Sequence, residues 1–162
     1  MARHRSGTLR LAALLVLGAA LTGFALRSPT ALSPRFNHVM LYVSDLDASI
    51  AFYTQAFGVE QRFLHPSGDY GELETGATTL AFASEALRDS NGIHARNNRL
   101  EHDAPGVEIA WVTDHVEEAM ARAVQAGAQP VAEATTKPWS QVVGYVRDLN
   151  GVLVELCAPV SG

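Results

Sequence analysis

The sequence predicts an α+β fold built from two βαβββ modules. Two stretches lie roughly seventy positions apart, and each runs from a short apolar strand through a polar cap into an amphipathic helix. The first stretch spans residues 37–53 and the second spans residues 108–127. His38 stands at the start of the first strand, where Glu108 stands in the second. This internal duplication, with three further short strands after each helix, is the basis of the prediction.

The first module is expected to run in the order strand, helix, strand, strand, strand. Alternation in its first strand places His38 and Tyr42 on one face. Asp45 offers a side-chain oxygen to the N-terminus of the helix, and Gly58 ends that helix. Residues 66–69 form a turn between two strands. The expected elements are residues 36–43, 46–57, 59–64, 70–74 and 78–83, so that the module covers about residues 36–83.

A long loop separates the modules, because residues 84–105 show no periodicity. Loops of this length are usually functional or mobile. The second module, about residues 106–158, then repeats the order of the first. Its expected elements are the strand 107–112, the helix 116–126 and the strands 129–134, 142–147 and 152–157.

The N-terminus has the layout of a secretory signal peptide. Basic side chains between positions 3 and 10 precede the uncharged apolar run 11–26. Residues 1–27 are therefore predicted to be a signal peptide, with cleavage after Ala25, and residues 28–35 a linker. The protein is expected to be exported to the periplasm or the extracellular space. One alternative is an uncleaved membrane anchor, although the run is a little short of the about 20 residues that span a bilayer. The other is a start codon placed too far upstream of a cytoplasmic protein.

Charge and cysteine content exclude several classes of protein. After residue 27 the chain has eight basic and 17 acidic residues, which disfavours a nucleic-acid partner. Cys157 is the only cysteine, so no intramolecular disulfide forms, and we expect it to be a small buried hydrophobe. His65, His94 and His102 fall in loops and are expected at the surface. No glycine-rich phosphate loop, Ser-His-Asp order or paired-cysteine zinc spacing is present.

Three polar residues interrupt apolar strands: His38, Glu108 and Glu155. A buried ionised carboxylate is costly unless it is paired or bound to a metal. If one curved sheet brings the three together, an imidazole and two carboxylates would hold a divalent cation and leave positions open for a substrate. A hydrogen-bonded His–Glu pair, or half-exposed residues at the rim of a sheet, explains the same pattern without a metal. The residues alone leave this choice open.

The motifs resemble the vicinal oxygen chelate superfamily, which includes glyoxalase, extradiol dioxygenases, methylmalonyl-CoA epimerase, fosfomycin-modifying enzymes and bleomycin-resistance proteins. The resemblance covers residues 36–159. It is carried by HVMLYVSDL at 38–46, AFY at 51–53, FG at 57–58, the strand 76–83 and DLNGVLVEL at 148–156. The resemblance implies paired βαβββ modules that form a curled mixed sheet around one cavity, with a metal at its base.

Matched residue by residue, the resemblance implies His38, Glu108 and Glu155 as metal ligands, with catalytic roles for the two carboxylates. The fourth ligand position of the family falls near Ala81, which cannot bind metal. The turn also departs from the family, with Leu149-Asn150 where Pro-Asp is usual. The ion implied is Mg, Mn, Fe, Co, Ni or Zn.

The resemblance implies a metal-dependent lyase, isomerase or dioxygenase that acts on a small substrate with neighbouring oxygens. The alternative is a metal-free small-molecule binding or drug-sequestering protein of the bleomycin-resistance type. In that protein an aromatic, hydrogen-bonding cavity would hold the ligand. Its walls would be Tyr42, Trp111, Trp139 and Gln141. The resemblance also implies a homodimer. From the N-terminal run, contact with a membrane is expected only through an uncleaved N-terminal segment.

Overall fold

The computed structural model describes residues 34–160, and the compact folded unit begins at Arg35. The signal peptide predicted over residues 1–27 and most of the predicted linker lie outside the described residues. Within residues 34–160, no helix has both the length and the apolar character needed to cross a membrane.

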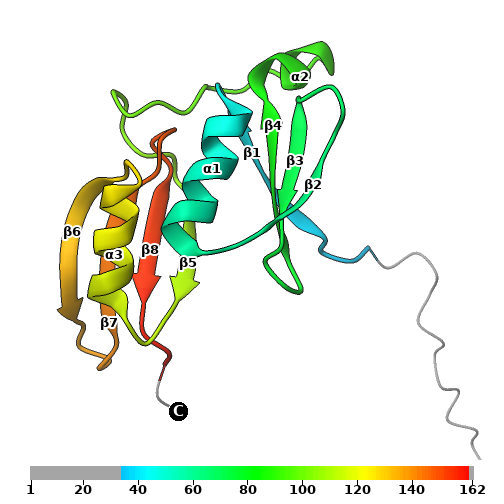
Figure 1. Ribbon diagram of the computed structural model, residues 1–162. Helices are drawn as coiled ribbons and strands as arrows, with labels where there is room; N and C mark the ends of the chain where they lie inside the picture. The colour runs from blue at the N-terminus through cyan, green and yellow to red at the C-terminus, as the bar shows by residue number, and fades with distance from the viewer. Residues whose placement is uncertain (1–33, 161–162) are drawn as a thin grey trace, which may run out of the picture. The chain divides into compact units, whose positions relative to one another are not determined.

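Each module of this unit contributes one four-stranded sheet and one long helix (Figure 1). The first module consists of β1 (His38–Val43), α1 (Leu46–Phe57), β2 (Gln61–Leu64), β3 (Tyr70–Leu73) and β4 (Thr79–Ser84), followed by the short helix α2 (Glu85–Ser90). The second consists of β5 (Glu108–Val112), α3 (Val116–Gln125), β6 (Gln129–Thr136), β7 (Val142–Arg147) and β8 (Leu153–Cys157). The predicted α+β fold of two βαβββ modules is therefore confirmed.

The two sheets have the same topology. The strand order is β1-β4-β3-β2 in the first sheet and β5-β8-β7-β6 in the second, with one parallel pair, β1 with β4 or β5 with β8, in each. His38 opens β1 opposite Thr79, and Glu108 opens β5 opposite Leu153, so the two residues are equivalent. One curled sheet was expected, but within the described residues no ladder joins β1 to β5. Each first strand pairs instead with the last strand of its own module, which leaves β1 and β5 as edges.

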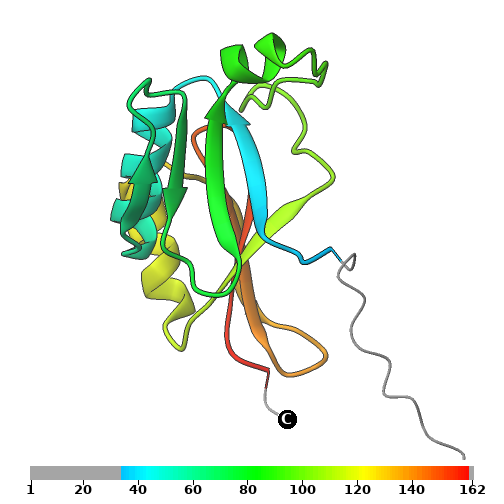
Figure 2. The same ribbon diagram turned by 90° about the vertical axis from the view of Figure 1, so that its right-hand side faces the viewer.

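Both long helices cover the same side of the sheets and pack against each other (Figure 2). Leu41 and Val43 of β1 point into this core, as does Phe82 of β4. Trp111 of β5 stacks on Phe57 of α1, with ring centroids 4.9 Å apart. We call the opposite side of each sheet its helix-free face. By strand alternation, that face carries the polar residues that open β1 and β5.

Local signals explain the helix boundaries. The Asp45 carboxylate accepts a hydrogen bond from the Ala48 amide at 2.9 Å, and Gly58 ends α1 with a left-handed φ of 71°. The prediction of an unstructured segment over residues 84–105 is wrong where α2 forms. Ser84 caps α2, because its hydroxyl accepts a hydrogen bond from the Leu87 amide at 3.0 Å.

A buried polar network ties the first module to the β7–β8 turn. The Tyr53 hydroxyl donates to the Asp148 carboxylate at 3.0 Å, and the Asn150 amide donates to the Ser49 hydroxyl at 2.9 Å. Asp148 is fully buried, and this burial raises its pKa. Asn150, part of the departure from the usual Pro-Asp turn, therefore supplies a contact between modules that a turn residue chosen only for local geometry would not make.

Candidate functional site

Glu155 lies half-buried on the helix-free face of the second sheet. Its cross-strand partner is Tyr145 of β7, whose hydroxyl donates to Glu155 Oε2 at 2.8 Å. This hydrogen bond, and then burial, raises the pKa of Tyr145 to about 12. The phenol therefore stays protonated at neutral pH and holds the carboxylate in one orientation.

Glu108 and Cys157 flank this pair. Ala110 is the register partner of Glu155, so Glu108, two residues earlier on β5, lies on the same face. Cys157 is buried, as expected, and burial together with a hydrogen bond to Glu155 raises the pKa of its thiol to about 11. The thiol stays protonated and is a poor nucleophile at neutral pH. The groups on this face that are available for proton transfer or for binding a cation are therefore the two carboxylates, Glu108 and Glu155.

The helix-free face of the first sheet carries His38 and also Glu72 of β3, a carboxylate that the sequence interpretation missed. Glu72 is the register partner of Ala81. It accepts hydrogen bonds from the Tyr70 hydroxyl at 2.5 Å and from Arg62 Nε at 3.0 Å. These contacts, with a smaller contribution from His38, lower the pKa of Glu72. The signal in the sequence was the alternation of Tyr70 and Glu72 on one face of a strand.

His38 is exposed, and its Nδ1 lies 2.9 Å from the Asn37 amide nitrogen. Among residues 34–160 there is no group of three His, Cys, Asp or Glu residues close enough to hold a metal ion. The potential ligands lie on two sheets, with His38 and Glu72 on the helix-free face of the first and Glu108 and Glu155 on that of the second. Imidazole and carboxylates suit a divalent cation in kind. The placement of these side chains in a single chain does not suit a metal ion, because His38 and Glu72 lie on one sheet and Glu108 and Glu155 lie on the other.

The four residues predicted to form one aromatic cavity lie apart. Tyr42 is on the helix-free face of β1, whereas the Trp111 indole packs toward α1. Trp139 is 62% exposed, and its Nε1 donates to Gln141 Oε1 at 2.8 Å. The Gln141 amide in turn donates to the Ala158 carbonyl at 2.7 Å. The prediction of one shared cavity is therefore wrong for the single chain, because strand alternation separates the first two residues and a hairpin carries the others.

A pocket of about 380 Å³ lies between the two sheets, where the edge of β5 faces β1 and β4. Thr79, the register partner of His38, lines one wall, and Glu108 and Trp111 line the other. The remaining walls are mostly apolar. Trp111 Nε1 is buried and has no hydrogen-bond acceptor within the described part of the chain. The pocket therefore offers mostly apolar walls and one carboxylate, and the Trp111 Nε1 donor is covered rather than open to it.

Comparison with known proteins agrees with this architecture. Residues 35–156 match the model of the Glyoxalase/Bleomycin resistance protein/Dioxygenase superfamily. The chain belongs to this superfamily, which confirms the resemblance that the motifs suggested.

Several similar proteins are described as lactoylglutathione lyases or as glyoxalase-related. The chain is 29% identical over 131 residues to a probable lactoylglutathione lyase of Vibrio cholerae, a match that covers 75% of this chain and 88% of the relative. A solved glyoxalase-related enzyme from Fulvimarina pelagi shares 25% identity, with a TM-score of 0.67 over 77% of this chain and 88% of that one. A lactoylglutathione lyase from Agrobacterium tumefaciens shares 27% identity, with a TM-score of 0.57 over 78% and 95% of the two chains.

Proposed function

We propose that this protein is a lyase or isomerase of the glyoxalase type, in which Glu155 transfers a proton on a small substrate with neighbouring oxygens. The observation that carries the proposal is the Glu155–Tyr145 hydrogen bond of 2.8 Å on the helix-free face of the second sheet. A carboxylate in a fixed orientation beside a protonated phenol is the arrangement that general acid–base catalysis needs.

The reaction requires a group that removes a proton and returns it. Glu155 would take the proton from a hydroxyl-bearing carbon next to a carbonyl and give it back to the carbonyl carbon, while the hydroxyl proton moves to the former carbonyl oxygen, so the substrate is isomerised with no net change in charge. The Tyr145 hydroxyl keeps the carboxylate aimed at that proton. Glu108, on the same face, adds negative charge that favours a neutral or cationic reacting group.

The relatives supply the first substrate to test. Proteins described as lactoylglutathione lyases are similar to this chain over most of its length. Their name describes the cleavage of lactoylglutathione into methylglyoxal and glutathione. The hemithioacetal that forms from these two compounds has neighbouring oxygens on a small carbon skeleton, and it is therefore the substrate of choice for an assay.

A divalent metal and a dimer belong together in this proposal. Superfamily members usually use divalent metals. Such an ion would polarise the oxygens of a bound substrate. His38, Glu108 and Glu155 would hold it only if the helix-free faces of the two sheets meet. A second copy of the chain, whose first sheet approaches the second sheet of its partner, would bring these faces together.

The test compares two carboxylates of the two sheets, Glu155→Gln and Glu72→Gln. Removing a general base typically costs a factor of about 10²–10⁴ in rate. We therefore expect Glu155→Gln to lower kcat/KM for the hemithioacetal by at least about 100-fold, and Glu72→Gln to lower it less than about tenfold. Metal content and molecular mass are measured on the same samples. Equal losses in the two variants would contradict the assigned role of Glu155.

A second candidate function is the metal-free binding of a small apolar compound. It is supported by the mostly apolar pocket of about 380 Å³, which Trp111 and Glu108 line. The Glu155→Gln variant separates the two functions. A binding protein would keep its ligand affinity, as followed by tryptophan fluorescence, whereas the proposed enzyme would lose its turnover.

A further inference from the structure

Within the segment between the modules, residues 88–99 carry a net positive charge in an otherwise acidic protein, with three arginines and one aspartate. Three of the eight arginine and lysine residues after position 33 lie within residues 88–99, whereas the 17 acidic residues are spread along the chain. His94 and His102 are in the same stretch, which was expected to be a surface loop. Both histidines are exposed, as expected. Their surroundings show why this segment differs from an ordinary solvated loop.

Arg88 is the unusual member of this segment, because it is almost fully buried. Only 4% of its side chain is exposed. Its Nε and Nη2 both donate to one oxygen of Asp89, at 2.9 and 2.7 Å, and the guanidinium lies 5.7 Å from the centre of the Tyr42 ring. Its Nη1 is buried and has no acceptor within the described residues. A buried donor without an acceptor is costly, so a ligand that accepts from it would be stabilised.

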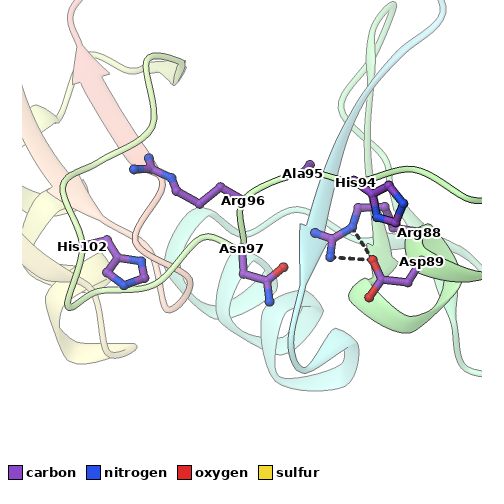
Figure 3. A pocket seen from close by; sticks show the side chains of 7 residues that line it. All are labelled: Arg88, Asp89, His94, Ala95, Arg96, Asn97 and His102. Carbon is purple, nitrogen blue, oxygen red and sulfur yellow. Dashed lines mark hydrogen bonds and ion pairs between the residues drawn. The ribbon is translucent and has the colours of Figure 1, made fainter.

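Arg88 lines a pocket of about 480 Å³ between α2 and the loop, although its Nη1 is itself covered. One side of the pocket is formed by Arg88, Asp89 and His94. The other side is formed by later residues of the same loop, which are Arg96, Asn97 and His102. Figure 3 shows that the end of the guanidinium remote from Asp89 is turned toward the side of Ala95 and Asn97. The walls therefore present guanidinium, imidazole and amide groups with a single carboxylate.

The loop that forms the far wall is held in place at its centre. Arg99 donates to the Glu85 carboxylate of α2, with Nη2 to Oε2 at 2.8 Å. Arg147 of β7 donates to the backbone carbonyls of Arg99 and Leu100, at 2.9 and 3.0 Å. Glu85 of the first module and Arg147 of the second thus both hold residues 99–100 of the loop. A wall fixed in this way reduces the conformational entropy that binding would otherwise cost.

We propose that this pocket binds the carboxylate of a small molecule. The two guanidiniums carry two positive charges, and Asp89 neutralises one of them, so a single negative charge balances the site. A carboxylate oxygen would accept from Arg88 Nη1, and the second oxygen would accept from the Asn97 amide. The Arg96 guanidinium, which Figure 3 shows turned away from Arg88, would contribute only its charge. Exposed loop side chains must move aside to admit it, because Nη1 is covered from solvent. The site does not depend on the function proposed for Glu155.

The proposal is tested by titrating the full protein with acetate at constant ionic strength and following NMR signals of arginine Nε–H groups and asparagine amides. Acetamide, which has the same shape without the charge, is the control ligand. We expect saturable changes at Arg88 and Asn97 with acetate, with an affinity on the order of millimolar for so small a ligand. No comparable change is expected with acetamide.

Arg88→Gln is expected to weaken acetate binding at least about tenfold, because it removes the charge-assisted donor. Arg96→Gln is the second variant, and because Arg96 is exposed this change can be tested even if Arg88→Gln does not fold. Arg96→Gln should weaken acetate binding about threefold, because it removes one positive charge from the site. Arg62→Gln, at an exposed arginine of the first sheet, should leave binding unchanged. Unsaturable changes, equal responses to acetate and acetamide, tighter binding of inorganic phosphate, or wild-type affinity in Arg96→Gln would overturn the proposal.

Discussion

The two sheets place different chemistry at equivalent positions. Ala81 in the first sheet corresponds to Glu155 in the second, since each faces the middle of its module's first strand. Their partners on the adjacent strands, Glu72 and Tyr145, correspond in the same way. Each helix-free face therefore has a carboxylate beside a phenol. The carboxylate is on β8 in the second sheet but on β3, not on the equivalent strand β4, in the first.

The surroundings of the two carboxylates show what this difference means. Glu72 forms an ion pair with Arg62 in addition to its bond from Tyr70, so its charge is already neutralised. Glu155 forms no ion pair within residues 34–160 and is held only by hydrogen-bonding neighbours. The first sheet therefore uses its carboxylate to stabilise a strand pair, whereas the second keeps its carboxylate available for a ligand.

The largest effect should come from the turns that close the two modules. Asp148→Ala in the β7–β8 turn leaves the Tyr53 hydroxyl and the amides of Asn150 and Val152 without their acceptor. We expect a loss of about 3–5 kcal/mol in the free energy of unfolding, measured with urea. Thr75→Ala in the β3–β4 turn removes the hydrogen bond that the hydroxyl donates to the Thr78 carbonyl and the one that it accepts from the Leu80 amide, and should cost about 1–2 kcal/mol.

Asp148→Asn serves as the control for the first variant, because its amide oxygen still accepts from the two backbone amides of the turn. It should lose about 1–2 kcal/mol. Similar losses for Asp148→Ala and Thr75→Ala would contradict the conclusion that the buried network at the β7–β8 turn stabilises the contact between the modules.

A smaller effect is expected from the two phenols. Tyr145→Phe removes the donor that orients Glu155, so we expect kcat/KM for the hemithioacetal to fall about tenfold. Tyr70→Phe removes the equivalent donor from Glu72 and should change kcat/KM less than about twofold. Steady-state kinetics measures kcat/KM of both variants, and thermal unfolding checks that both are folded. A larger loss from Tyr70→Phe would place the reaction on the first sheet.

The smallest effect concerns acid stability. The folded pKa of Glu72 lies below its ordinary value of 4.5, because the Tyr70 hydroxyl and the Arg62 guanidinium favour the carboxylate. Its contribution to stability is present above that value and is lost as the pH falls through the folded pKa. Wild type should exceed Glu72→Gln in Tm by about 1–3 °C at pH 6, and the difference should decrease as the pH falls below 4.5 and through the lower folded pKa. A difference that does not decrease would mean that packing, not ionisation, is responsible.

Sequence patterns predicted α1 at its observed boundaries, the order of the strands and the equivalence of His38 with Glu108. They missed Glu72 as a site residue, because its position opposite Ala81 depends on the register of the β3–β4 hairpin. They also missed α2, whose six residues are too few for periodicity to show. The predicted metal cluster required contact between faces of different sheets, which alternation along one strand does not specify.

The sequence by itself determined the features that depend on neighbours along the chain: strand alternation, helix caps and the repeated module order. The tertiary structure decided which residues meet across strands and modules. It separated the sheets, turned Trp111 toward α1, placed Tyr145 on Glu155 and left Arg88 buried beside Tyr42. The physical reason is that strand pairing and core packing select partners far apart in the chain by shape and hydrogen bonding, and no local pattern encodes that choice.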